Sequence, residues 1–133
     1  MTLKRFTLNT ASKEGLYPIT EQVREAVGQS QAHSGLAVVF CPHTTAGITI
    51  NENADPAVGR DLLKGLGVAF PDQRSFEHLE GNSAAHLKAL AVGSEVNVII
   101  ENGSLLLGVW QGIYFGEFDG PRSRTFFVKV MKD

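Results

Sequence analysis

Residues 95–110 carry the clearest folding signal in the chain, "EVNVIIENGSLLLGVW", in which two apolar runs flank Asn102-Gly103. An Asn-Gly pair suits the two positive φ angles of a type I′ turn, which joins neighbouring strands of a hairpin. The pattern therefore predicts a hairpin formed by "EVNVII" and "SLLLGVW". Beyond it, "GIYFGEF" (112–118) and "RTFFVKV" (124–130) are predicted strands on either side of a turn at "DGPR".

The first half of the chain adds three predicted strands. Residues 2–8 alternate polar and apolar side chains, and the candidates for the buried side are Leu3, Phe6 and Leu8. The run "GLAVVFCP" (35–42) is continuous and apolar, which favours a strand buried on both faces. "GITINE" (47–52) is a further strand with isoleucines on one side.

Helix signals separate these strands. Thr20 is the expected cap of a helix to about residue 31, whose apolar stripe is Ile19, Val23, Ala26 and Val27. Asp55-Pro56 supplies a capping side chain followed by proline at the first helical position.

The helix that starts at Asp55-Pro56 is expected to turn Val58, Leu62 and Leu63 inward and to end near Gly65 or Gly67. After an irregular segment, a shorter helix is expected to start at Asn82 or Ser83 and to run through "AAHLKALAV". The sum is one α+β domain over residues 1–133. Its sheet is large, mostly antiparallel or mixed and sandwich-like, with two or three helices packed on it.

Composition narrows the class of protein. The chain has 133 residues, 43% apolar and 20% charged, with a net charge of −2. That balance predicts no nucleic-acid partner. The sequence lacks a signal peptide and the ~20 consecutive apolar residues that span a bilayer, so no membrane role is expected. Cys41 is the only cysteine; this suits a reducing cytoplasm, where we expect it to pack rather than to act as a nucleophile.

Four histidines are candidates for chemistry. His33 is expected to be structural, because it follows a helix C-terminus. His43 ends the apolar strand, while His78 and His86 flank the start of the last helix. No two have the i, i+4 spacing of a metal-binding helix. Three imidazoles in one site would nevertheless hold a divalent metal and leave a position open for water or substrate.

The charged residues of the last third leave two interpretations open. Glu117 lies within an apolar strand, where a carboxylate needs a partner. Arg122 and Arg124 alternate and so share a strand face, which suits a phosphate. The alternative is an internal salt bridge from these arginines to Glu117 or Asp119. Trp110 and Gln111, by contrast, fit ordinary core and sheet positions.

Three motifs together resemble one family: "HTTAGITINENAD" (43–55), "HLEGNSAAHLK" (78–88) and "NGSLLLGVWQGIYFGEFDGPRSR" (102–124). They are similar to the small YjbQ-type proteins described as secondary thiamine-phosphate synthases. The resemblance extends from Ser34 to Val130 and implies a compact α+β fold, a homotrimer and a polar pocket. The implied activity joins a pyrimidine-methyl diphosphate to a thiazole phosphate and releases pyrophosphate.

Carried over by position, the resemblance implies two sets of site residues. The catalytic set is His43, His78, His86 and Glu117, and its histidines are also the tentative ligands of a divalent metal, zinc or magnesium. Substrate and phosphate binding is implied for Thr44, Thr45, Asn51, Glu52, Asn82, Gln111, Arg122 and Arg124.

Two other functions remain open from the sequence. One is a metal-dependent hydrolase, in which the three histidines hold an ion that activates water. The other is a non-catalytic trimer that binds a small anion. The expected partner is a small phosphorylated molecule, although the hydrolase would also accept other esters.

Overall fold

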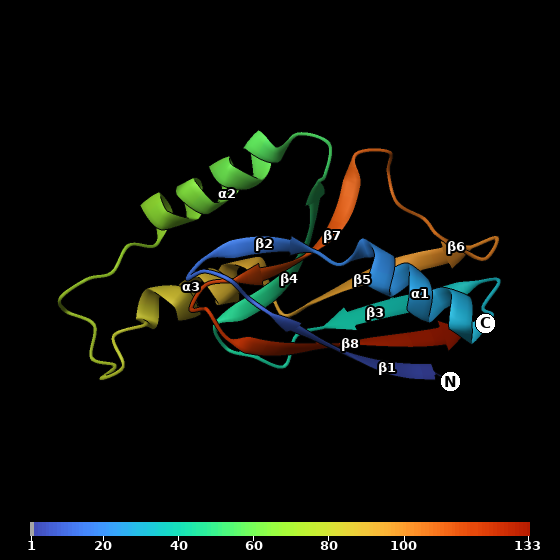
Figure 1. Cartoon of the computed structure of the whole chain (residues 1–133), viewed down its shortest axis with the longest axis horizontal. Coiled ribbons are helices and arrows are strands. Elements are labelled where there is room, and N and C mark those ends of the chain that lie inside the picture. The colour runs from blue at the N-terminus through green and yellow to red at the C-terminus, as the bar shows by residue number, and fades with distance from the viewer. Residues whose placement is uncertain (1) are drawn as a thin grey trace.

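The computed structural model describes residues 2–133, which form two antiparallel sheets and three helices (Figure 1). The five-stranded sheet has the order β1-β8-β3-β5-β6, and the three-stranded sheet has the order β2-β7-β4. The predicted α+β class is therefore confirmed. The strands are β1 Thr2–Asn9, β2 Gly15–Pro18, β3 Gly35–Phe40, β4 Ala46–Glu52, β5 Glu95–Glu101, β6 Ser104–Leu105, β7 Gln111–Glu117 and β8 Ser123–Lys132; the helices are α1 Thr20–Ser30, α2 Pro56–Ala69 and α3 Ser83–Val92.

The main core joins the two sheets and α1. Its members alternate along β3, β4, β7 and β8, as the two-residue period of a strand requires. The stripe predicted for α1 is confirmed, since its residues are all at most 2% exposed. Thr20 is the first helical residue rather than the cap, and its Oγ1 accepts a hydrogen bond from the Ile113 N–H at 2.8 Å. This bond ties α1 to β7.

The predicted hairpin is confirmed at its turn but is shorter than expected. Asn102 and Gly103 have φ values of 53° and 77°, as a type I′ turn requires. The second strand, β6, ends at Leu105, and residues 106–110 form a loop. Trp110 is 62% exposed on that loop, so its assignment to the core was wrong. Apolar and polar side chains do not alternate in the run "LLLGVW", so its sequence does not specify a paired strand.

The five-stranded sheet is covered on one face only. Ala37 and Val39 of β3 are fully buried, whereas Leu36 and Phe40 are about two-fifths exposed, so burial on both faces was a wrong expectation. Leu3 is 59% exposed, while Phe6 and Leu8 pack against the core. Leu3 has the opposite parity to Phe6 and Leu8, and alternation therefore turns it to the open face.

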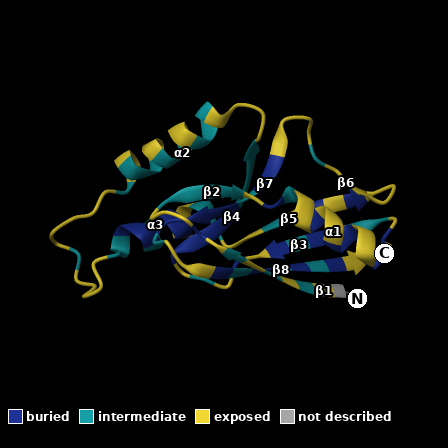
Figure 2. Ribbon diagram, viewed as in Figure 1, coloured by how far each residue is buried: buried dark blue, intermediate teal, exposed yellow. Residues whose placement is uncertain are grey.

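Helix α2 starts as expected but ends and packs differently. Asp55 caps it by accepting a hydrogen bond from the Ala57 N–H at 2.9 Å. The helix passes Gly65 and Gly67 and continues to Ala69, because an interior glycine weakens a helix without ending it. It has no fully buried residue, and Figure 2 shows it standing away from the sheets with exposed and half-buried positions. Val58, Leu62 and Leu63 are only half-buried.

Strand β2 and the start of α3 differ from the prediction. Strand β2 pairs with β7 and was not predicted, because "GLYP" is short and ends in proline. Helix α3 begins after Asn82 as expected, but the Asn82 side chain makes no capping hydrogen bond. Among residues 2–133, no helix is long and apolar enough to cross a bilayer.

Candidate functional site

A close backbone contact positions the candidate site. The loop after β3 and the start of β4 are both held by the turn between α3 and β5. The Cys41 N–H donates to the Ser94 carbonyl at 2.8 Å, and the Ile48 N–H donates to the Gly93 carbonyl at 3.0 Å. Gly47 permits this approach, because a Cβ there would lie 2.5 Å from the Gly93 oxygen. The result is that the His43 loop lies against the C-terminal end of α3.

A surface groove of about 380 Å³ lies along this contact, with His43 and Thr44 on one side and His86 on the other. The rest of its lining consists of Ala46 at the start of β4, Ala89 and Leu90 of α3, and Gly93 and Ser94. His78 is outside the groove, but its ring packs edge-on against His86 with centroids 5.5 Å apart. The three histidines, which come from two separate motifs, thus lie in one region of the fold.

One nitrogen of His43 is already engaged. Its Nε2 accepts a hydrogen bond from the Thr125 backbone N–H at 3.0 Å. Burial, reinforced by the positive charge of Arg124, lowers the pKa of His43 below its ordinary value. The ring is therefore neutral at pH 7 and carries its proton on Nδ1. His43 is set up to donate a hydrogen bond from Nδ1 to an acceptor atom.

The donor arrangement does not fit a three-histidine metal centre within one chain. Metal binding by His43 through Nε2 would compete with the Thr125 hydrogen bond. Among residues 2–133, no three His, Cys, Asp or Glu side chains are grouped so that they could hold a metal ion. A zinc or magnesium ion at these histidines therefore remains a prediction from the sequence.

Behind the groove lies a buried ion pair. Glu117 is 0% exposed and Arg124 is 4% exposed. Arg124 donates to both carboxylate oxygens of Glu117 and also to Thr45 Oγ1 at 2.8 Å. Thr10 Oγ1 and the Asp119 N–H donate to the same carboxylate. The sequence leaves open whether Arg124 binds a phosphate or forms an internal salt bridge. In this structure Arg124 forms the internal salt bridge with Glu117.

These contacts fix the ionisation of Glu117. Burial acts to raise its pKa, but the hydrogen bonds from Arg124, Thr10 and Asp119 outweigh burial and leave the pKa lowered. Glu117 is therefore ionised, and both of its carboxylate oxygens already accept hydrogen bonds from neighbouring residues. It holds the end of β7 to β8 and to the His43 loop.

Arg122 and Asp119 form a second, more exposed pair. Arg122 donates to the Asp119 backbone oxygen at 2.8 Å and to Asp119 Oδ2 at 2.9 Å. Asn82 Nδ2 donates to the same Oδ2 at 2.8 Å, which joins the "DGPR" turn to the start of α3. The Arg122 side chain is 48% exposed and does not line the histidine groove. Its positive charge nevertheless adds to the effect of burial in lowering the pKa of His43.

Comparison with known proteins gives the family. A model described as "UPF0047 protein YjbQ-like" matches residues 4–133. YugU of Bacillus subtilis is 48% identical over 130 residues, which cover 97% of this chain and 98% of the relative. The chain belongs to the YjbQ/UPF0047 family. Within the family, MJ1081 of Methanocaldococcus jannaschii is 49% identical over 131 residues, covering 98% of this chain and 95% of the relative.

Solved structures of the YjbQ family share this fold. A Clostridium acetobutylicum member has a TM-score of 0.94 at 55% identity, with 96% of this chain and 99% of that chain covered. A YbjQ-like protein of Sulfolobus solfataricus has a TM-score of 0.95 at 31% identity, covering 99% of this chain and 97% of that chain.

In this YjbQ-family chain the remaining predicted residues lie elsewhere. Asn51, Glu52 and Gln111 are at the far end of the three-stranded sheet, where Glu52 pairs with Gln111. Ala46 and Glu52 are the two ends of β4, six residue steps apart, which corresponds to about 20 Å. The structure therefore divides the predicted set into a histidine end and a Glu52 end.

Sequence reasoning missed two participants at the histidine end. Thr10 donates to Glu117, and the Thr125 N–H fixes the His43 ring. Thr10 gives no signal in the sequence, because an isolated threonine after a strand is common. The role of Thr125 belongs to its backbone and depends on the packing of the His43 loop against β8. Cys41 is 1% exposed, and burial raises the pKa of its thiol, so it packs as expected.

Proposed function

We propose that the chain is a small-molecule transferase that binds a phosphorylated substrate in the His43–His86 groove. The observation that carries the proposal is the neutral, oriented His43 imidazole, which lines one groove together with His86. A preorganised N–H donor and a half-exposed arginine suit an anion whose charge grows during reaction. The family resemblance supplies the substrate class: a pyrimidine-methyl diphosphate and a thiazole phosphate.

The proposed step assigns roles to residues of this chain. The methyl carbon of the pyrimidine forms a bond to the thiazole as its C–O bond breaks, and the electron pair leaves with pyrophosphate. His43 Nδ1–H donates to a departing phosphate oxygen, and Arg122 stabilises the accumulating negative charge. His86, braced by His78, binds the diphosphate from the opposite side. Glu117 and Arg124 are positioning residues, since they contact each other rather than the groove.

Turnover with purified protein tests this proposal. With both substrates present, pyrophosphate release is expected, and His86→Ala should reduce the rate by about 100-fold or more, because one binding donor is lost. His33→Ala is the matched control, since His33 lies on the loop between α1 and β3, outside the groove. Equal rates for wild type and His86→Ala would contradict the assignment.

The same assay separates the two other candidate functions. A metal-dependent hydrolase would release phosphate from the diphosphate alone and would lose activity with a chelator, in step with metal content. A non-catalytic anion-binding protein would bind pyrophosphate without turnover under any condition. The cytoplasmic location expected from the sequence is part of the proposal, and the buried free thiol of Cys41 is consistent with it.

A homotrimer is also part of the proposal. The open face of the five-stranded sheet carries Leu3, Leu36, Phe40, Ile99 and Met131, each at least 38% exposed. On that face, acidic residues lie at one side and basic residues at the other: Glu95 and Glu101 on β5, Arg5 on β1 and Lys129 on β8. Such a face suits head-to-tail contacts between copies that close into a ring.

Sedimentation equilibrium measures this directly. The expected mass is about 43 kDa, three times the chain mass of 14.4 kDa. Ile99→Lys places a charge on the open face beside Leu36 of β3 and should give monomers. Leu79→Lys, at a fully exposed position outside both sheets, should leave the trimer intact. A monomeric wild type, or a trimer that survives Ile99→Lys, would refute the interface.

A further inference from the structure

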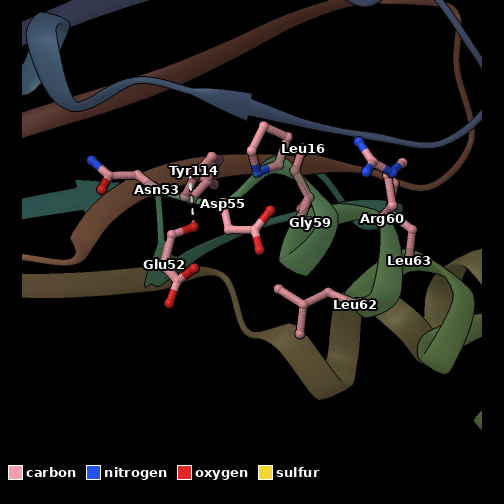
Figure 3. A pocket seen from close by; sticks show the side chains of 10 residues that line it. Leu16, Glu52, Asn53, Asp55, Gly59, Arg60, Leu62, Leu63 and Tyr114 are labelled. Atoms are coloured by element: carbon pink, nitrogen blue, oxygen red, sulfur yellow. Dashed lines mark hydrogen bonds between the residues drawn. The ribbon is translucent and has the colours of Figure 1, made fainter.

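A second groove lies at the Glu52 end of the three-stranded sheet, under α2. Its volume is about 390 Å³. One wall consists of Leu16 on β2 and Tyr114 on β7, and the other consists of Leu62 and Leu63 on α2 (Figure 3). Because α2 has no fully buried residue, this apolar surface is open to a ligand. The groove shares no lining residue with the histidine groove.

Two carboxylates lie together at one end of the second groove. Figure 3 shows the Glu52 and Asp55 side chains next to each other, with the Arg60 guanidinium toward the opposite end. Asp55 Oδ1 accepts the capping bond from Ala57. Within residues 2–133, neither carboxylate has a Lys, Arg or His nitrogen at salt-bridge distance. The acidic end thus has negative charge without a cationic partner.

Tyr114 connects the apolar wall to the acidic end. Its hydroxyl donates to the Glu52 backbone oxygen at 3.1 Å, which fixes the phenol beside Glu52. Burial, together with the negative charge of Glu52, raises the pKa of Tyr114. The phenol therefore remains a neutral donor and adds no charge of its own. The local field at this end is negative.

We propose that the second groove binds a small organic cation: an ammonium group held by Glu52 and Asp55, attached to an apolar or aromatic body that lies along Leu16, Leu62 and Leu63. An ammonium donates charge-assisted hydrogen bonds to both carboxylates, and the apolar body covers the leucines. An anionic ligand meets repulsion at the same end. This site is separate from the histidine groove and does not depend on the transferase activity.

Trp110 provides a reporter for the test. It is the only tryptophan, and its backbone oxygen accepts a hydrogen bond at 2.9 Å from Asn53, which lines the groove. Benzylamine and benzyl alcohol have nearly the same shape but differ in charge, so both are titrated by fluorescence and by calorimetry. Saturable binding of benzylamine is expected, with benzyl alcohol about tenfold weaker or more.

Substitutions locate the site. Glu52→Gln preserves side-chain size and should weaken benzylamine binding by about tenfold or more, while benzyl alcohol binding changes little. Asp61→Asn is the matched control, since it removes a negative charge from α2 outside the groove and should leave both affinities unchanged. Circular dichroism confirms that each variant is folded.

Four outcomes would overturn the proposal. The first is equal affinity for benzylamine and benzyl alcohol, and the second is unchanged benzylamine binding by Glu52→Gln. The third is the absence of saturable binding by calorimetry. If Leu62→Lys dissociates an oligomer of the wild type, the groove is a contact between copies of the chain, and the ligand assignment also fails.

Discussion

Glu117→Gln is expected to lower the free energy of unfolding by about 3–5 kcal/mol, because it leaves the buried Arg124 guanidinium without its counter-charge. Both side chains of the pair are almost completely buried. The carboxylate accepts four hydrogen bonds, from Thr10, the Asp119 N–H and twice from Arg124, and Arg124 also donates to Thr45. Urea unfolding followed by far-UV circular dichroism measures the loss.

Two comparisons check the origin of that loss. Glu21→Gln breaks the exposed pair with Arg24 and should cost at most about 1 kcal/mol. The double variant Glu117→Gln/Arg124→Met removes both charges and should be more stable than Glu117→Gln alone. If Glu117→Gln alone is as stable as wild type, the Glu117–Arg124 pair does not stabilise the ends of β7 and β8.

Acid provides an internal check on the same pair. The pKa of folded Glu117 is lowered, so its contribution to stability is complete above the unfolded value of about 4.3. That contribution disappears as the pH falls through the folded pKa. The stability difference between wild type and Glu117→Gln should therefore be largest near neutral pH and shrink in acid.

Gly47→Ala is expected to destabilise the chain by about 1–3 kcal/mol, because the close contact below the histidine groove leaves no room for a methyl group. The added Cβ would lie 2.5 Å from the Gly93 oxygen and 3.1 Å from Val92 Cγ1. The Gly93 oxygen also accepts the Ile48 N–H, so it cannot move without weakening that bond. Thermal and urea unfolding measure the effect.

Gly65→Ala is the control for glycine replacement. Gly65 lies inside α2, and a Cβ there would meet nothing within 4 Å. Alanine in an unobstructed helix should stabilise by about 0.5–1 kcal/mol. Opposite signs for the two substitutions are therefore expected, and a neutral Gly47→Ala would contradict the close contact.

Much of the fold followed from local patterns. The Asn102-Gly103 turn, the Asp55 cap and the α1 stripe were predicted because each depends on neighbours in the sequence. The open face of β3 was not, because a run such as "GLAVVF" is apolar on both sides whether or not a second layer covers it. The short strand β2 escaped because it exists only through pairing with β7.

The candidate site was predictable in its members more than in its arrangement. His43 and His86 do line one groove. Arg124 could have bound phosphate or Glu117 with the same chemistry, and only packing decides between them. Glu52 is nine residues from His43 in the sequence, yet the extended strand β4 carries it to the other end of the sheet. Spacing along a chain does not reveal that separation.

Strand β4 thus acts as a fixed spacer about 20 Å long between two grooves of different charge. Sites that are this far apart and share no partners contribute independently to the free energy of a process. Substitutions at one end can therefore accumulate without altering what the other end binds. The binding properties of the two grooves can therefore change independently among relatives, although one strand of seven residues contributes to both.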